Sequence, residues 1–230
     1  MKTLAIIPAR GGSKRIPRKN IKSFAGQPII KYSIDAAINS GCFEEIMVST
    51  DDKEIAEVAK SFGAKVPFFR SEKNSNDMAG TAPVLGEVVE EYRKLGKEFE
   101  YVCCIYPTAL FVTGERLQLA QKMILDNKAE AVVPVMRFSY PIQRALRIKN
   151  GRAEMFWPEN YTARSQDLEP AYHDCGQFYF LKTESLLKQK VLYPEFTVPL
   201  EIPDSEAQDI DNEEDWKIAE IKFKLIKDTK

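Results

Sequence analysis

Thr3-Leu-Ala-Ile-Ile7 is followed at once by Pro8-Ala-Arg-Gly-Gly-Ser-Lys-Arg-Ile-Pro-Arg-Lys-Asn20, which predicts a strand that ends in a basic loop. Two glycines let backbone N–H groups approach the oxygens of a ligand, and five cationic side chains supply the opposite charge. No Asp or Glu occurs before Asp35, so no carboxylate of this stretch neutralises those cations. The loop is therefore predicted to hold the triphosphate of a nucleotide, and a solvated basic loop without a ligand is the alternative.

Strand-like and helix-like runs alternate over most of the chain. We expect helices over 28–40, 52–62, 82–95 and 113–126, and strands over 45–49, 65–69, 101–106, 131–135 and 176–181. This alternation indicates parallel strand–helix–strand units with helices on both faces of the sheet. Asn212 is expected to cap a final helix. The 230 residues are thus expected to form one α/β domain, a three-layer α/β/α sandwich with a mostly parallel sheet.

The alternation breaks down between about residues 137 and 170. Asn150-Gly151 favours a tight hairpin between strands over 146–148 and 153–157. Such a β-rich insertion cannot bury both of its faces alone. We therefore expect a protruding arm that packs on a second copy of the chain, in a homodimer.

The composition excludes several classes of protein. With 33 basic and 34 acidic residues the net charge is −1, which argues against a nucleic-acid partner. The four cysteines have neither the number nor the spacing of a disulfide framework or a zinc site. We expect neither a signal peptide nor a membrane-spanning segment, because the opening apolar run meets a charged loop by Arg10. We expect a cytoplasmic protein without a membrane partner.

Asp209-Ile-Asp211 is the second pattern with a chemical meaning. In an extended segment, residues two apart face the same way, so both carboxylates can approach one cation while Ile210 packs inward. Mg²⁺ prefers few carboxylates together with phosphate oxygens and water. Such a pair by itself is often a helix cap or simply solvated, and this stays the alternative. Together with the basic loop, it predicts magnesium binding at Asp209 and Asp211.

The basic loop resembles the signature of the CMP-sugar synthetases, nucleotidyltransferases that activate acidic sugars with CTP. The Walker and dinucleotide-binding patterns are both absent. Other stretches occur in the family's order: Ser49-Thr-Asp-Asp52, Tyr106-Pro-Thr108, Gly176-Gln-Phe-Tyr179 and Gln208-Asp-Ile-Asp211. The resemblance covers nearly the whole chain and implies a Rossmann-like, GT-A-like nucleotidyltransferase fold.

Within that family, the arm sequence looks like the branch that makes CMP-pseudaminic acid for bacterial surface glycosylation, notably of flagellin. Activation of sialic acid, legionaminic acid or Kdo is the alternative within the same chemistry. A nucleotide-binding protein without catalytic activity is the alternative from another class.

The resemblance also implies roles for individual residues. Nucleotide binding is implied for Arg10, Gly11, Gly12, Ser13, Lys14, Lys19, Asn20, Arg70, Asp77, Ala79, Thr81, Tyr106, Pro107 and Thr108. Catalytic roles are implied for Arg10, Lys19, Asp209 and Asp211. Arg10 and Lys19 are suited to stabilising the charge that grows on the α-phosphate as diphosphate leaves.

The acidic nine-carbon sugar would attack the α-phosphorus through its anomeric hydroxyl. Contacts to this sugar are expected from Gln143, Arg144, Arg164, Gln166, Gln177 and Tyr179, each of which could instead be an arm or dimer contact. His173, the single histidine, is expected to be a structural hydrogen-bonding residue rather than a base.

Overall fold

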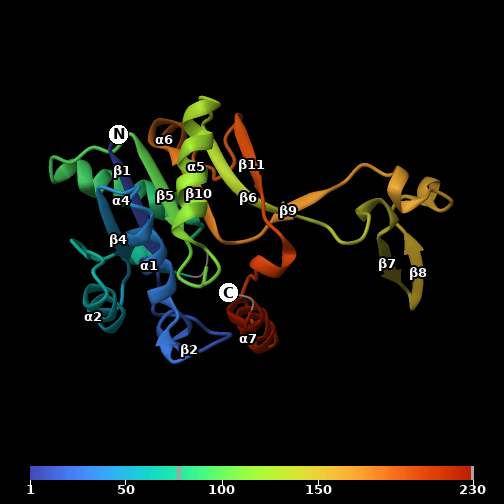
Figure 1. Ribbon diagram of the computed structural model, residues 1–230, viewed down its shortest axis with the longest axis horizontal. Helices are drawn as coiled ribbons and strands as arrows, with labels where there is room; N and C mark the ends of the chain where they lie inside the picture. Colours follow the sequence, from blue (N-terminus) through green and yellow to red (C-terminus); the bar gives the residue numbers. More distant parts are fainter. Residues whose placement is uncertain (77–78, 229–230) are drawn as a thin grey trace.

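A mixed sheet of seven strands forms the centre of the computed structural model, which describes residues 1–76 and 79–228 (Figure 1). The order of neighbouring strands is β11 (Thr197–Glu201), β6 (Ala131–Arg137), β10 (Phe178–Lys182), β5 (Tyr101–Ile105), β1 (Thr3–Pro8) and β4 (Glu45–Ser49), with β9 (Tyr172–Asp174) paired to β6. β4, β1 and β5 are parallel, as are β6 and β11, whereas β10 runs antiparallel between β5 and β6.

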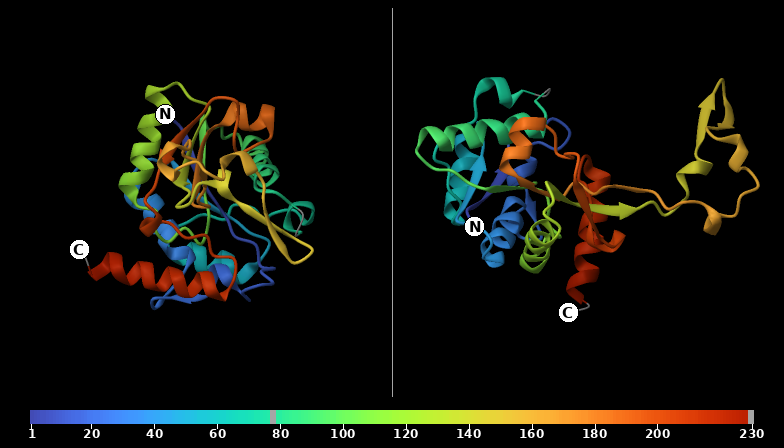
Figure 2. Two further views of the ribbon diagram at one scale, coloured as in Figure 1. Left: turned by 90° about the vertical axis from the view of Figure 1, so that its right-hand side faces the viewer. Right: turned by 90° about the horizontal axis from the view of Figure 1, so that it is seen from above.

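Helices cover both faces of this sheet, so the prediction of a three-layer α/β/α sandwich is confirmed (Figures 1 and 2). On one face lie α1 (Ile30–Ser40), α2 (Lys53–Ser61) and α5 (Gly114–Asp126); on the other lie α4 (Thr81–Lys94) and α6 (Thr183–Gln189). Cys103 packs in the first core and its neighbour Cys104 in the second. This is the alternation that a buried strand requires, because successive side chains point to opposite faces.

A third core holds the last helix against the body. α7 (Glu213–Asp228) packs through Trp216 on Phe24, whose ring is fully buried, and the two ring centroids are 5.3 Å apart. As predicted, Asn212 caps α7: its Oδ1 accepts the backbone N–H groups of Glu214 and Asp215, at 2.8 and 3.0 Å. Ile210 is buried in the same core, so the segment that precedes α7 is fixed against the loop that follows β1.

Two predicted elements differ in the structure. The strand expected over 65–69 is reduced to a single bridge between Met47 and Lys65, because Pro67 has no N–H to donate to a ladder. The first helix begins at Ile30 rather than at Pro28. Pro28 belongs instead to a small hairpin of β2 (Ser23–Phe24) and β3 (Gln27–Pro28). The turn between these strands has two residues with positive φ, the geometry that favours a two-residue hairpin.

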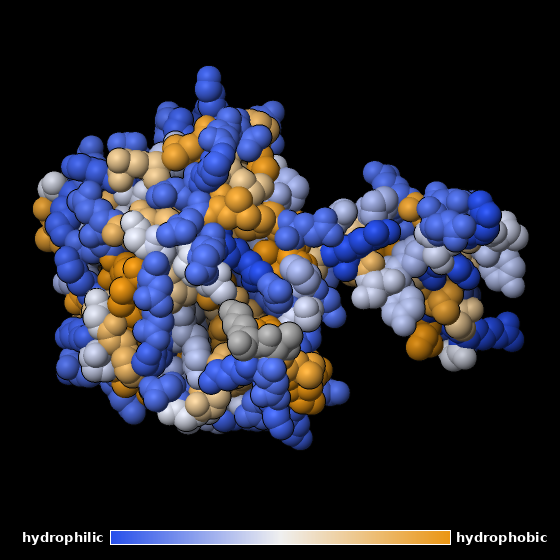
Figure 3. Space-filling view, in the orientation of Figure 1, coloured by the Kyte–Doolittle hydropathy of each residue, from blue (hydrophilic) through white to orange (hydrophobic). Residues whose placement is uncertain are grey.

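The segment between β6 and β9 leaves the body as an arm (Figures 1 and 2). It carries the predicted hairpin, formed by β7 (Leu146–Lys149) and β8 (Arg152–Met155) around Asn150 and Gly151, both with positive φ. Apolar side chains of the arm are open to solvent (Figure 3), and Ile148 is 85% exposed. The remaining short helices are α3 (Glu72–Ser75), η1 (Lys19–Ile21), η2 (Ile142–Arg144), η3 (Pro158–Asn160), η4 (Ser165–Asp167) and η5 (Asp204–Glu206). Within residues 1–76 and 79–228, every helix is too short or too polar to cross a lipid bilayer.

The contact between α1 and α5 gives a stability prediction. A Cβ at Gly114 would lie 3.0 Å from the backbone of Asn39 and Ser40, which cannot move aside, whereas a Cβ at Gly86 within α4 would meet no atom within 4 Å. Gly114→Ala should therefore lower the free energy of unfolding by about 1–3 kcal/mol. Gly86→Ala should raise it by about 0.5–1 kcal/mol, the ordinary helical preference for alanine. Urea unfolding of both variants measures the two effects, and a gain from Gly114→Ala would contradict the close packing.

Candidate active site

A cavity of about 540 Å³ lies where β1 and β5 end, at the carboxyl edge of the parallel strands. Three separate parts of the chain line it: the basic loop after β1, the turn after β5 and the segment before α7. The lining residues are Pro8, Arg10, Ser13, Lys14, Arg15, Lys19, Asn20, Tyr106, Pro107, Thr108, Asp209 and Asp211. All of them except Pro8 and Arg15 are predicted site residues, so the fold brings the predicted phosphate and metal residues together.

Lys19 faces the aspartate pair across this cavity. Its Nζ donates to the backbone oxygen of Ile210 at 2.6 Å, between the two predicted metal ligands. Burial lowers the pKa of Lys19, and the charges of Asp211 and Asp209 oppose that shift. Burial and then the neighbouring Asp211 raise the pKa of Asp209. A half-buried cation and a pair of mutually repelling carboxylates thus line the same cavity.

Hydrogen bonds hold the basic loop in place. Asn20 is buried and donates from Nδ2 to the backbone oxygen of Arg10 at 2.9 Å, so its amide supports the loop. The N–H of Gly11 donates to Asp51 Oδ1 at 2.9 Å. Gly12 is exposed, and a Cβ there would meet no atom within 4 Å. Of the two glycines, Gly11 is therefore the one that the packing requires.

Arg70, Ala79 and Thr81, which are also assigned to nucleotide binding, do not line the cavity. Thr81 Oγ1 and the hydroxyl of Tyr106 are 2.8 Å apart, and burial raises the pKa of Tyr106 to about 12. Arg70 is buried, and it donates to Ser49 Oγ at 3.1 Å and to the Ser49 backbone oxygen at 2.5 Å. Ala79 donates its N–H to the Asn76 backbone oxygen at 3.3 Å. Asp77 lies outside the described residues.

The residues assigned to the sugar fall into two groups, and none of the six lines this cavity within one copy of the chain. Gln177 and Tyr179 lie in the body: Gln177 Nε2 donates to the Glu206 backbone oxygen at 2.8 Å, and the Tyr179 hydroxyl donates to Asp174. The other four lie on the arm. Their sugar-binding roles therefore stay predictions.

The arm residues already have partners within the arm. Gln143 Nε2 donates to the Glu169 backbone oxygen at 2.9 Å, and Arg164 pairs with Asp167 at 2.7 Å. Arg144 lies 3.5 Å from Ser165 Oγ, and Gln166 lines a separate cavity of about 420 Å³ on the arm.

Sequence reasoning missed several residues that build the site. Arg15 lines the cavity, and its Nη2 donates to Asp211 Oδ1 at 2.7 Å. Asp51 and Asp52 bind the basic loop from outside the cavity: Asp51 accepts the N–H of Gly11, and Asp52 accepts from the guanidinium of Arg18. Arg15 and Arg18 belong to the cationic run visible in the sequence, but spacing alone does not show which cations point into a cavity and which point away.

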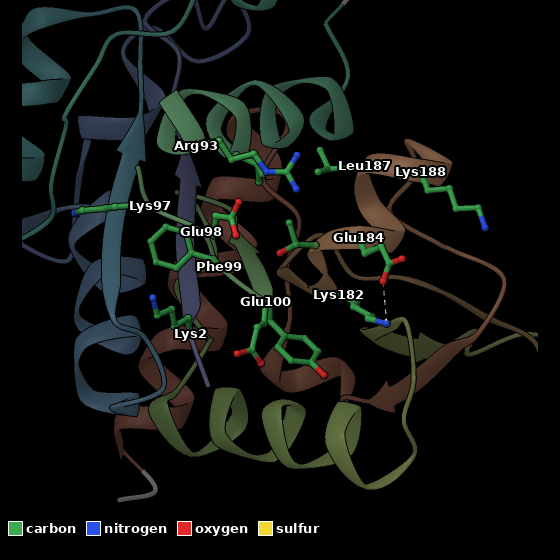
Figure 4. A pocket seen from close by; sticks show the side chains of 13 residues that line it. Lys2, Arg93, Lys97, Glu98, Phe99, Glu100, Lys182, Glu184, Leu187 and Lys188 are labelled. Carbon is green, nitrogen blue, oxygen red and sulfur yellow. Dashed lines mark ion pairs between the residues drawn. The ribbon is translucent and has the colours of Figure 1, made fainter. Parts of the chain in front are cut away.

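A larger cavity, of about 880 Å³, lies at the opposite ends of β1 and β5 (Figure 4). Its lining includes Lys2, Glu100 and Lys182, and part of its charge is already paired, with Lys182 Nζ 3.2 Å from Glu184 Oε2. No predicted site residue lines it. The smaller cavity is therefore the candidate active site.

Asp209 and Asp211 fit the ligand preference of Mg²⁺. Both are carboxylates on one wall of the cavity, beside the cations of the basic loop. In the part of the chain that the structure describes, no group of three or more His, Cys, Asp or Glu side chains is placed to hold a metal. Two carboxylates that leave the remaining ligands to phosphate oxygens and water are typical of Mg²⁺ sites in enzymes that use nucleotides.

Comparison with known proteins agrees with the fold and identifies the family. Pseudaminic acid cytidylyltransferase of Campylobacter jejuni is 41% identical over 226 residues, 98% of this chain and 97% of the relative. CMP-N,N'-diacetyllegionaminic acid synthase of Legionella pneumophila is 35% identical, again over 98% of this chain and 97% of the relative. Among solved structures, CMP:2-keto-3-deoxy-manno-octonic acid synthetase complexed with CTP covers 99% of this chain and 100% of its own, with a TM-score of 0.70. At 17% identity this third likeness shows the fold alone.

A family model described as cytidylyltransferase matches residues 4–195, a span that contains the basic loop, the arm and most of the central sheet, with β11 outside it. The match extends over far more than half of the chain, and the two relatives are similar over almost its full length. The chain therefore belongs to the cytidylyltransferase family and is a nucleotidyltransferase.

Proposed function

We propose that the chain transfers CMP from CTP to pseudaminic acid, yielding CMP-pseudaminic acid and diphosphate, with Mg²⁺ as cofactor. The observation that carries this proposal is the cavity in which the basic loop faces Asp209 and Asp211. The choice of sugar is supported by the 41% identical relative, which is a pseudaminic acid cytidylyltransferase. The activities of other relatives make legionaminic acid the second candidate.

The residues of the cavity suit an in-line displacement at the α-phosphorus. The sugar hydroxyl loses its proton to solvent as its oxygen forms a bond to that phosphorus. The bond between that phosphorus and the oxygen that bridges to the β-phosphate breaks, and diphosphate leaves with the electron pair. Arg10 and Lys14 would hold the triphosphate, and Lys19 would stabilise the growing charge on the α-phosphate. Mg²⁺ bound by Asp209 and Asp211 would screen the triphosphate and polarise its oxygens.

The proposed assembly is a homodimer of one-domain chains, each with its arm at about residues 137–170. Tyr140, Tyr161 and Ile148 on the arm are between 74% and 85% exposed, which is costly for apolar side chains in water. A second copy of the chain that covers this arm would also bring the arm's arginines and glutamines into contact with that copy. We place the enzyme in the cytoplasm, where CTP is available, and its product in glycosylation of the bacterial surface, notably of flagellin.

Loss of the aspartate pair should abolish the reaction. Asp209→Asn and Asp211→Asn each remove a ligand charge while keeping the side-chain volume, so turnover should fall by at least about 100-fold at any Mg²⁺ concentration. His173→Asn is the control, because His173 is assigned no chemical role. Diphosphate release from CTP measures the effect. Undiminished activity in Asp211→Asn would contradict the metal assignment.

A panel of sugars tests the substrate. Diphosphate release should be fastest with pseudaminic acid when it is compared with legionaminic acid, sialic acid and Kdo at equal concentration, and it should require Mg²⁺. Faster release with one of the other sugars would contradict the assigned substrate and leave the assigned reaction, cytidylyl transfer, in place. CTP binding without turnover of any of the four sugars would favour the alternative of a non-catalytic nucleotide-binding protein.

The oligomeric state tests the arm. Leu146→Ser combined with Ile148→Ser should convert a dimer into a monomer, because both residues lie two apart on β7 and are 61% and 85% exposed. Leu95→Ser is the matched control, since Leu95 is 59% exposed but lies on the body. Sedimentation equilibrium distinguishes the two masses. A wild-type monomer would contradict the proposed dimer.

A further inference from the structure

Asp52 lies outside the cavity, and its carboxylate binds both the basic loop and the first turn of α2. Its Oδ2 accepts from Arg18 Nη1 at 2.5 Å, and its Oδ1 accepts from Arg18 Nη2 at 3.0 Å. Oδ1 also accepts the backbone N–H of Ile55 at 3.0 Å, which caps α2. Paired hydrogen bonds between a guanidinium and a carboxylate fix direction as well as distance. The start of α2 is thereby joined to the far end of the basic loop.

The turn between β4 and α2, which carries Asp51 and Asp52, also contacts the beginning of the basic loop. A Cβ placed on Gly11 would lie 2.7 Å from Asp52 Oδ2, so the loop backbone passes directly against this carboxylate. Asp51 accepts the N–H of Gly11. The turn between β4 and α2 thus holds the basic loop at both ends, at Gly11 and at Arg18.

Arg18 connects this contact to the cavity. Its φ is 55°, in the left-handed region that costs free energy for a residue with a Cβ. Its backbone oxygen accepts the N–H groups of Ile21 and Lys22, both at 3.0 Å, and so forms the turn that carries Lys19. The side-chain pairing with Asp52 holds Arg18 in this conformation. Lys19, the next residue, can then place its Nζ on the oxygen of Ile210.

The pairing is ionic over the working range of an enzyme. Hydrogen bonding to Arg18 lowers the pKa of Asp52 to about 2, and the same contact raises the pKa of Arg18. Glu54 also binds the Arg18 guanidinium, so two carboxylates face one cation. The Arg18 side chain is 38% exposed and that of Asp52 is 22% exposed, so the charges are partly shielded from water.

We propose that Asp52 and Arg18 form a clamp that positions Lys19 for transfer at the α-phosphorus of CTP. The clamp rests on the proposed function, because its purpose is the placement of a cation beside the reacting phosphate. Asp52 and Arg18 are positioning residues: neither lines the cavity, and they act through the backbone that carries Lys19.

Asp52→Asn isolates this role. Asparagine caps helices as well as aspartate does, so α2 keeps its first turn. The paired hydrogen bonds of Asp52 to Arg18 and one of the two carboxylate charges on Arg18 are lost, and Glu54 alone remains. A misplacement of about 1 Å can cost about 100-fold in rate, so kcat should fall by about 10- to 100-fold while the KM for CTP changes less than about threefold. Arg18→Gln should give the same result from the other partner. Glu57→Gln removes an exposed pair with Lys60 on α2 and should leave kcat unchanged.

A double-mutant cycle with Lys19→Ala shows whether the clamp acts through Lys19. In the Lys19→Ala background, Asp52→Asn should lower kcat by less than about twofold, because the side chain that it positions is already absent. The same 10- to 100-fold loss in both backgrounds would overturn the proposal, and so would an unchanged kcat in Asp52→Asn. If Asp52→Asn does not fold, the cycle is carried out with Arg18→Gln.

Hydrogen exchange of the protein without CTP supplies a readout that does not depend on turnover. Asp52→Asn should speed exchange of the backbone amides of residues 10–20 and leave those of 53–61 as in the wild type. Unchanged exchange over 10–20 would overturn the clamp. The proposed function fails separately, if the wild type and Glu57→Gln both release no diphosphate from CTP with any sugar.

Discussion

The contact between Lys19 and the segment that carries Asp209 and Asp211 is the interaction on which the site depends. Lys19 Nζ donates a hydrogen bond to the backbone oxygen of Ile210, 191 positions away in sequence. Burial at this place destabilises the charged forms of both Lys19 and Asp209. Charges in such a position persist only where groups of opposite sign face them. In the proposed reaction, a nucleoside triphosphate with a divalent cation would satisfy both sides at once, since its phosphates would meet the lysine and its cation would meet the carboxylates.

The sheet and the third core make that contact possible. β1 lies between β4 and β5 in a parallel group, so the loops that follow β1 and β5 leave at the same edge. Phe24 and Trp216 then fix α7 beneath the basic loop. Ile210 is buried in that core, and its two acidic neighbours turn toward the cavity because alternate side chains of an extended segment face opposite ways. The aspartates are thus positioned by the apolar residue between them.

The arm has a different physical character from the body. The body buries its strands between helices, whereas β7 and β8 form an isolated two-stranded sheet whose apolar side chains remain in water. Two strands rarely form a stable unit without a further surface to cover them. A second copy of the chain meets this need in the proposed dimer, and the arm is also where four of the six predicted sugar contacts lie. Sugar specificity in this proposal therefore depends on a part of the chain that only assembly completes.

The sequence by itself determined the layered α/β architecture, the hairpin at Asn150, the cap at Asn212 and the residues of the basic loop and aspartate pair, because periodicity, turn chemistry and charge are local properties. Other features were not readable from it: the loss of a strand at Pro67, the reversal of β10, the pairing of Arg15 with Asp211 and the grip of Asp52 on Arg18. Only the tertiary structure decided these, since strand direction and the pairing of exposed charges depend on which distant segments become neighbours. Five cations in one loop look alike in sequence, and only the packing shows that four of them line the cavity whereas Arg18 binds Asp52 at the start of α2.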